Sequence, residues 1–396
     1  MRQLIALLLG GVIGCASIGA TPGGPLRTTP PTLVKVTPDS GATDVKDKSV
    51  IFEFDVVVSD RGPGGELGNL FLLSPAEGAA HVDWKRNRIE VRPRKPFRPN
   101  TAYAVTMLPG ISDQRGNVLK TSRTIVFSTG PTIPPYAVYG RVFDWMSERV
   151  AGRAIVEAIR HPDSLPYVGV SDSTGQFAVG PLDEGSYTVR GFIDNNNNRA
   201  LDPGEPWDSV SIAVHGTSPF LELLLAPRDT TPPRLLTVNA SDSVTFVASF
   251  DHPLDPSLPL SPPPIRVLNA DSTALRIASV TTRATFDSIQ RARLDSIALH
   301  EVTARAGGDT TRRPITRADT TRLVPQPSAA MKPSRPAPPK DLVVRLDPAT
   351  PMRPNASYRI IAVNVRGLLG PPRTSDRVIT APRARADSAA AKARKP

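Results

Sequence analysis

Residues 194–205, DNNNNRALDPGE, carry oxygen atoms at a spacing that could bind a metal ion. Counted from Asp194, oxygens fall at positions 1, 3, 5, 7, 9 and 12. These positions are Asp194, Asn196, Asn198, the backbone carbonyl of Ala200, Asp202 and Glu205. Calcium takes about six to eight oxygen ligands, and a glutamate that binds through both oxygens at the last position completes such a shell. The spacing therefore predicts a structural calcium site.

The same run also fits an interpretation without metal. The sixth position is Arg199, where the sharp turn of a calcium loop usually has glycine, so Asn198 or Arg199 would need a positive φ. Asn and Asp side chains also close ordinary polar turns by bonding nearby backbone groups. The run resembles the EF-hand-type loops of calcium-stabilised spacer modules in cell-surface proteins, which favours metal. Both interpretations stay open.

Cys15, the only cysteine of the chain, ends a short apolar run at the amino terminus. Residues 4–13 are apolar but too few to span a bilayer, and Arg2 supplies a positive charge before them. The ending VIGC resembles the bacterial lipobox, in which the cysteine takes a lipid and becomes the first residue after cleavage. This resemblance implies a signal peptide at 1–14, a lipidated Cys15 and a flexible tether at 15–29. The alternative is an ordinary secretory signal with an incidental cysteine.

These candidate sites need a scaffold, and residues 30–130 are predicted to form short strands separated by turns. The stretch RNRIEVRP alternates, with Ile89 and Val91 on one face, and PDSGATD, RPN and DQRGN are turn signals. The pattern predicts a β-sandwich. The stretches TPDSGATDV, WKRNRIEVRP and FRPNTAYAVTMLPGISDQRGN resemble the bacterial Ig-like domain of the S-layer-protein type, a family without catalytic residues. We expect Trp84 to lie in the core.

Residues 131–227 are predicted to form a second sandwich of short strands with tight turns at SDSTGQF and DEGSY. The stretches GRVFD, DSTGQF and LDEGSYTV resemble the carboxypeptidase regulatory-like fold, which is prealbumin-like. In surface proteins such modules often act as spacers, and some relatives bind glycans. Trp145 and Trp207 are the candidate platforms for stacking a sugar, and the alternative is that both are partly buried anchors.

Residues 228–382 repeat the first unit in a divergent form, because PFRPNTAY recurs as PMRPNASY and PPTLVKV as PPRLLTV. The repeat contains an insertion at 282–340 that is basic and poor in aromatic residues, so we expect most of it to be disordered. Residues 284–304 have apolar side chains at loosely helical spacing and could form one transient or docked helix. The basic tail at 383–396 is also predicted to be disordered.

The positive charge of the chain is concentrated in two segments. Residues 283–340 carry 11 basic and 5 acidic residues, and residues 383–396 carry 5 and 1, which accounts for nearly all of the net charge of +11. No aromatic platform or nucleic-acid motif accompanies it, so we do not expect nucleic-acid binding. The five histidines are scattered singly, and none of the common catalytic motifs occurs. We therefore predict no catalytic residues and no enzyme activity.

Taken together, the sequence predicts an all-β chain of three tandem Ig-like and prealbumin-like β-sandwiches with a disordered basic insertion and tail. We predict a lipid-anchored cell-envelope protein, monomeric, with a structural, scaffolding or adhesive role. Ala16 after the cysteine favours the outer membrane by resemblance to other lipoproteins. The alternative function is a glycan-binding accessory lipoprotein of a polysaccharide uptake or degradation system. Its partner would be an envelope protein in the first case and a polysaccharide in the second.

Overall fold

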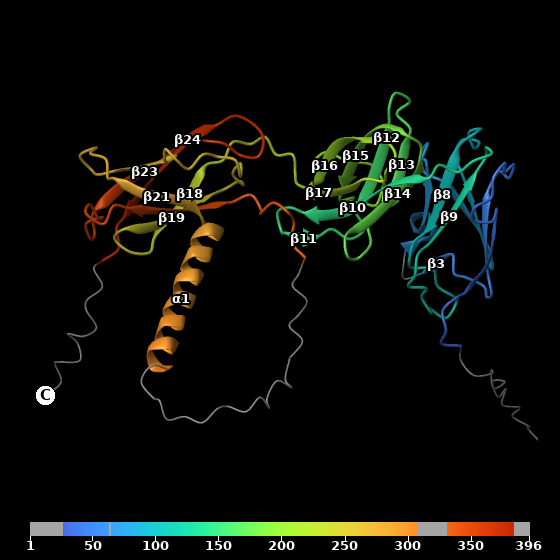
Figure 1. The fold of residues 1–396 in the computed structure, drawn as a ribbon, viewed down its shortest axis with the longest axis horizontal. Coiled ribbons are helices and arrows are strands. Elements are labelled where there is room, and N and C mark those ends of the chain that lie inside the picture. The colour runs from blue at the N-terminus through green and yellow to red at the C-terminus, as the bar shows by residue number, and fades with distance from the viewer. Residues whose placement is uncertain (1–26, 63–64, 307–330, 384–396) are drawn as a thin grey trace, which may run out of the picture.

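The computed structural model describes residues 27–62, 65–306 and 331–383, and most of its regular structure is β-strand. The strands form three units that lie in a row in chain order (Figure 1). Each unit has two main sheets around one buried apolar cluster. The prediction of an all-β chain of tandem sandwiches is therefore confirmed. No helix in the described ranges is long and apolar enough to cross a membrane.

The first unit packs a four-stranded sheet, in the order β1-β2-β7-β6, against a three-stranded sheet, β5-β8-β9. Buried and less buried residues alternate along β2 (Val50–Phe54), because successive strand residues point to opposite faces of a sheet. Ile89 and Val91 of β7 (Arg88–Arg92) are both buried, as their alternation predicts. The other elements are β1 (Leu33–Thr37), β3 (Arg61–Gly62), β4 (Gly65–Glu66), the 3₁₀ helix η1 (Leu67–Leu70), β5 (Phe71–Ser74), β6 (His81–Lys85), β8 (Ala102–Met107) and β9 (Arg123–Ser128).

The expectation that Trp84 lies in the core is wrong. Its side chain is 40% exposed, and its indole N–H donates to the backbone carbonyl of Val58 at 2.9 Å. Trp84 is the register partner of Ile89, which is fully buried. However, β6 is the edge strand of its sheet, so a side chain on that face lies at the rim of the sandwich. There the indole can bury part of its ring and still reach a polar partner.

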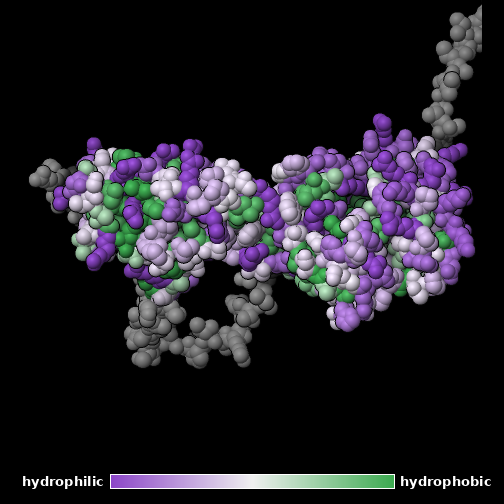
Figure 2. Space-filling view, turned by 90° about the horizontal axis from the view of Figure 1, so that it is seen from above, coloured by the Kyte–Doolittle hydropathy of each residue, from purple (hydrophilic) through white to green (hydrophobic). Residues whose placement is uncertain are grey.

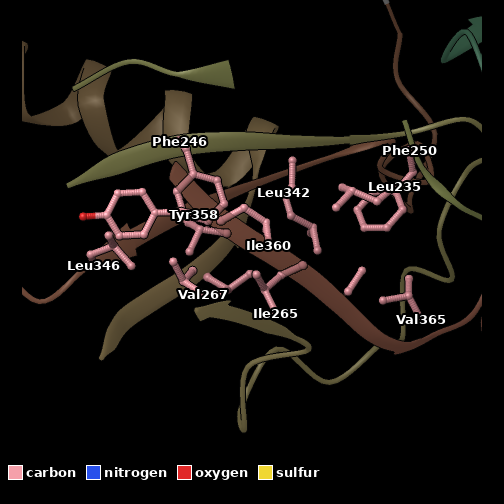
Figure 3. Close-up of a cluster of buried hydrophobic side chains, with 14 of the residues drawn as sticks. Leu235, Phe246, Phe250, Ile265, Val267, Leu342, Leu346, Tyr358, Ile360 and Val365 are labelled. Atoms are coloured by element: carbon pink, nitrogen blue, oxygen red, sulfur yellow. The ribbon is translucent and has the colours of Figure 1, made fainter. Parts of the chain in front are cut away.

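The third unit repeats the connectivity of the first. If the small hairpin β3-β4 is set aside, the first, second, fifth and fourth strands form one sheet in both units, and the third, sixth and seventh form the other. This is the arrangement of a constant-type immunoglobulin sandwich. Figure 3 shows Phe246, Tyr358 and Ile360 in its core. Its strands are β18 (Leu235–Ala240), β19 (Thr245–Phe250), β20 (Ile265–Leu268), β21 (Ile277–Thr282), β22 (Asp341–Leu346), β23 (Ser357–Val365) and β24 (Arg373–Thr380).

A buried tyrosine makes the same contact in both of these units. The hydroxyl of Tyr103 accepts a hydrogen bond from the Arg98 backbone N–H at 2.8 Å, and that of Tyr358 accepts one from the Arg353 N–H at 2.7 Å. Immunoglobulin sandwiches have a tyrosine corner at this point, near the start of the sixth strand. The recurring stretches PFRPNTAY and PMRPNASY therefore specify one local structure twice.

The second unit differs because one of its strand pairs is parallel. β17 (Phe220–Leu225) runs parallel to β10 (Tyr136–Asp144), which pairs antiparallel with β11 and β14. The facing sheet has the order β13-β12-β15-β16. Val142 and Leu223 lie in the apolar cluster between the two sheets. The remaining strands are β11 (Arg149–Val150), β12 (Ile155–Arg160), β13 (Pro166–Val170), β14 (Gln176–Leu182), β15 (Gly185–Phe192) and β16 (Trp207–Val214).

The described parts of the insertion are residues 282–306 and 331–340. Residues Arg283–Ala306 form helix α1, which covers the segment with loosely helical spacing and projects from the third unit (Figure 1). Ile289 and Leu294 of this helix are exposed. Residues 331–340 lead into β22. Before they reach it, they contact the second unit. Composition missed these contacts because it does not show where a polar segment can dock.

Candidate functional site

The loop at 194–205 joins β15 to the edge strand β16 of the second unit. Both carboxylate oxygens of Glu205 accept backbone N–H groups, from Asn195 at 2.8 Å and from Asp202 at 3.0 Å. Glu205 is only 5% exposed. Asp194 accepts two further backbone N–H groups, from Asn198 at 3.2 Å and from Arg199 at 2.8 Å. The carboxylates at the two ends of the loop therefore hold its backbone in place.

The asparagine side chains of the loop turn toward Asp202. The amide nitrogens of Asn196 and Asn198 donate to one oxygen of Asp202 at 2.6 and 2.7 Å, and the Asn198 amide oxygen accepts from the Ala200 N–H at 2.7 Å. A bound calcium ion would need these amide oxygens to face it, so it would replace the Asn–Asp202 pairs. Among the described residues, no three or more His, Cys, Asp or Glu side chains gather so that they could hold a metal ion.

Arg199, the departure from the calcium-loop pattern, has a positive φ of 60°. A non-glycine residue in this left-handed region costs about 1–2 kcal/mol, so other contacts must hold it there. Its guanidinium leaves the loop and donates to backbone carbonyls of the first unit, Phe71 at 2.7 Å and Gly68 at 3.0 Å. Burial lowers the pKa of this guanidinium, and Asp194 partly opposes the change. The loop is therefore part of the junction between the first and second units.

Two further hydrogen bonds join the first unit to the second. The Val168 N–H donates to the buried hydroxyl of Ser74 at 2.8 Å, and the Ala76 N–H donates to the Pro166 carbonyl at 2.9 Å. Both β5 and β13 are edge strands of their sheets, so each covers an edge that would otherwise have unpaired backbone groups. The sequence contains one signal for this junction. Arg199 stands at the position of the 194–205 loop where a calcium loop usually has glycine.

Trp145 and Trp207 line the same cavity, of about 560 Å³, between the second and third units. The guanidinium of Arg228 lies 4.1 Å from the ring centroid of Trp207, and that of Arg335 lies 4.9 Å from the ring of Trp145. The Trp145 indole N–H also donates to the Pro336 carbonyl at 2.9 Å. Each ring therefore already has a cation on it, and both tryptophans are partly buried. The structure brings these two predicted residues together, but about 60 residues of sequence separate them, so spacing could not predict it.

The acidic residues of this cavity are engaged in ion pairs and hydrogen bonds. Asp208 lies 3.7 Å from Arg228 and accepts the Leu224 backbone N–H at 3.0 Å. Burial would raise the pKa of Asp255, but hydrogen bonds from Ser257 and Arg366 outweigh it and lower the pKa overall. A general acid needs a raised pKa. Asp255 therefore favours its deprotonated form and does not suit the role of a general acid.

Cys15 lies outside the described residues, and so do the signal peptide at 1–14, most of the tether and nearly all of the basic tail. The lipidation prediction therefore stays a prediction. The two groups of predicted site residues that the structure describes do not form one site. The loop belongs to the first junction, the tryptophans belong to the second, and the cysteine falls before the first sandwich.

Comparison with known proteins identifies one unit. Residues 27–129 match the model of the bacterial Ig-like domain family. This range covers the first sandwich and agrees with the resemblance seen in its turns and strands. The match spans about a quarter of the chain, so the family describes this unit alone. No curated protein matches the chain in sequence.

Solved structures resemble the chain only distantly. The N-terminal part of the bacterial S-layer protein SbsC is 14% identical, with a TM-score of 0.19, over 50% of this chain and 43% of that one. An L,D-transpeptidase from Mycobacterium smegmatis is 15% identical, with a TM-score of 0.19, over 47% and 77%. BcpA, the major pilin subunit of Bacillus cereus, is 10% identical, with a TM-score of 0.17, over 50% and 71%. The chain spans less than half of the first of these, and scores this low carry no functional argument.

Proposed function

We propose that this chain is a non-catalytic structural component of a bacterial cell envelope, in which sandwich units hold two attachment points at a set distance. The observation that carries the proposal is the bonded junction between the first and second units, through Ser74, Ala76 and Arg199. Domains in one chain move relative to each other by default unless their interface restrains them. A restrained junction suits a spacer, and the bacterial Ig-like match supports the envelope assignment.

Small-angle X-ray scattering of the full chain tests the spacer role. We expect data that fit a fixed arrangement of the first two units, and we expect Arg199→Ala to require an ensemble of arrangements. Arg153→Ala is the matched control, because Arg153 also has a positive φ, of 65°, in the same unit and is exposed. A wild-type curve that already requires free movement between the first two units would refute the proposal.

We propose that Cys15 carries the lipid that attaches the chain to the outer membrane. The support is the position of this single cysteine at the end of the apolar run. Radiolabelled palmitate should enter the wild-type protein in a Gram-negative host, and Cys15→Ser should abolish labelling and release the protein from the membrane fraction. Labelling that persists in Cys15→Ser, or a wild-type protein in the cytoplasmic fraction, would contradict the anchor.

Calcium in the 194–205 loop is a further part of the proposal. The oxygen atoms have the right order along the chain, and the Arg199 guanidinium points away to the first unit, so it does not occupy the loop. If bound, calcium would cross-link the loop and stabilise the junction. Calorimetric titration should give one site per chain, lost in Asp202→Ala. Asp172→Ala is the control, because Asp172 closes a polar turn at Thr174 and Gln176 elsewhere in the unit. If the wild type gives no binding heat, the loop is a polar turn that does not bind calcium.

Glycan binding is the second candidate function, because both predicted tryptophans line one cavity. A sugar would have to displace Arg228 or Arg335 from the rings, which makes this function secondary. Affinity electrophoresis in gels containing envelope polysaccharides tests it. Binding that is lost in Trp207→Ala and retained in Trp84→Ala, a rim tryptophan of the first unit, would favour the glycan function. If the wild type and both variants migrate equally in gels with and without polysaccharide, glycan binding is excluded for those polysaccharides.

A further inference from the structure

One face of the second unit carries apolar side chains that its own core does not use. The parallel pairing of β10 with β17 places Arg141 beside Glu222 and Phe143 beside Leu224. Their sequence neighbours Val142 and Leu223 point into the core, so these four residues lie on the opposite face. Phe143 and Leu224 are nevertheless only 1% and 4% exposed. Segments from outside this strand pair must therefore cover them.

The return segment of the insertion, residues 331–338, lies along this face. The Met331 sulfur contacts the Arg141 guanidinium, near the start of the segment. Ser334 donates to the Glu222 carboxylate from its backbone N–H at 2.9 Å and from its hydroxyl at 2.5 Å. These contacts connect the third unit's insertion to strands β10 and β17 of the second unit.

The far end of the return segment docks on Trp145. The Arg335 guanidinium stacks on the indole, and the indole N–H donates to the Pro336 carbonyl at 2.9 Å. The Ala337 N–H then donates to the Glu148 carboxylate at 2.8 Å. Extended proline-rich peptides dock on aromatic-lined grooves. Here the segment docks on an indole that also donates a hydrogen bond, with the carboxylates of Glu148 and Glu222 beside it.

The positions of the prolines match the positions of the acceptors. In the stretch MKPSRPAPPK (331–340), only three of the residues between the first and last proline have a backbone N–H. Two of them, Ser334 and Ala337, are the residues whose N–H groups bind Glu222 and Glu148. The prolines restrict the segment to an extended conformation, so docking costs less conformational entropy.

We infer that the outer face of β10 and β17, with Trp145, Glu148 and Glu222, is a recognition surface for proline-rich segments that contain arginine. Residues 331–338 of the same chain are its resident occupant. The insertion therefore acts as a tethered ligand that fixes the third unit to the second. Tethering raises the effective concentration of the segment, so a modest intrinsic affinity is enough.

A peptide-binding experiment on the full chain tests this inference. The released variant carries Ser334→Pro and Ala337→Pro, which remove both N–H donors and keep the segment proline-rich. A fluorescent MKPSRPAPPK peptide should bind the released variant at least about tenfold more tightly than it binds the wild type, whose surface is occupied. Adding Trp145→Ala or Glu222→Gln to the released variant should abolish the gain. Ser334→Thr with Ala337→Ser keeps both N–H groups and the hydroxyl that donates to Glu222, and is the matched control, which should bind peptide no better than the wild type.

Each outcome decides the inference. Failure of the released variant to bind the peptide, while circular dichroism and thermal unfolding show that it is folded, would overturn the recognition surface. Binding that survives Trp145→Ala would also overturn it. A wild-type dimer in size-exclusion chromatography with light scattering, monomeric in the released variant, would overturn the assignment of the occupant to the same chain. None of these measurements depends on the junction between the first two units, so failure here leaves the spacer proposal standing.

Discussion

Replacement of Arg199 by glycine should separate two effects that act in opposite directions. Glycine adopts the observed φ of 60° without strain, so the second unit should gain about 1–2 kcal/mol of stability on its own. The same change removes two hydrogen bonds from a charged donor to Phe71 and Gly68. Such bonds contribute about 1.5–3 kcal/mol each when buried, and partial solvent access at Gly68 reduces this to about 2–4 kcal/mol for the pair.

The expected signature is therefore a change in cooperativity. In the wild type, the bonded junction should make the first two units unfold together or nearly so. In Arg199→Gly, the first unit should unfold earlier, because it loses the junction, while the second unit should unfold at the same temperature or later. Arg199→Ala loses the junction without the relief of strain, so its second unit should be less stable than that of Arg199→Gly by about 1–2 kcal/mol.

Differential scanning calorimetry of the full chain, with each transition assigned by hydrogen exchange, measures these differences. Arg153→Gly is the control for strain alone, because Arg153 has a φ of 65° and is exposed. It should stabilise the second unit without changing the coupling. If Arg199→Gly and Arg153→Gly behave alike, the guanidinium does not join the units and the account of the junction is wrong.

Three further predictions concern the scaffold. Tyr103→Phe and Tyr358→Phe should each cost about 1 kcal/mol, in the first and third unit respectively, as shown by separate urea unfolding transitions. The hydrogen bond and ion pair from Arg98 lower the pKa of Glu77 from 4.5 to about 2. This pair therefore stabilises the folded state above the unfolded pKa, and the stabilisation is lost as pH falls toward 2. The urea midpoints of the wild type and of Glu77→Gln should converge over that range. Gly140→Ala should cost about 3 kcal/mol or more by thermal unfolding, because the added carbon would lie 2.2 Å from a backbone oxygen of β17.

The sequence predicted features that depend on neighbours along the chain. The alternation in β7 placed Ile89 and Val91 inside, and the repeated RPN stretches predicted two related sandwiches. These signals are local, since strand alternation and turn chemistry act over a few residues. Trp84 shows the limit of this reasoning, because alternation gives the face of a strand but not its distance from the rim of the sandwich.

The contacts between units could not be predicted in the same way. Arg199 and the return segment each bind residues more than a hundred positions away. No periodicity links such positions, and the low hydrophobicity of 331–338 predicts disorder because composition does not include a docking partner. The sequence singles out Trp145 and Trp207, but their surroundings, including Arg335 and Arg228, follow from the assembled fold.

The insertion between β21 and β22 changes how many times the chain crosses the second junction. The linker that contains Arg228 crosses it once, and the return segment at Pro336 comes back across it. Both line the cavity at this junction, and Figure 2 shows the molecule narrowing between its two lobes. Two neighbouring bodies attached at one point can swivel about that point, whereas attachment at two separate points removes the swivel. A torque applied to one end of this molecule would therefore be transmitted through the narrow region to the other end.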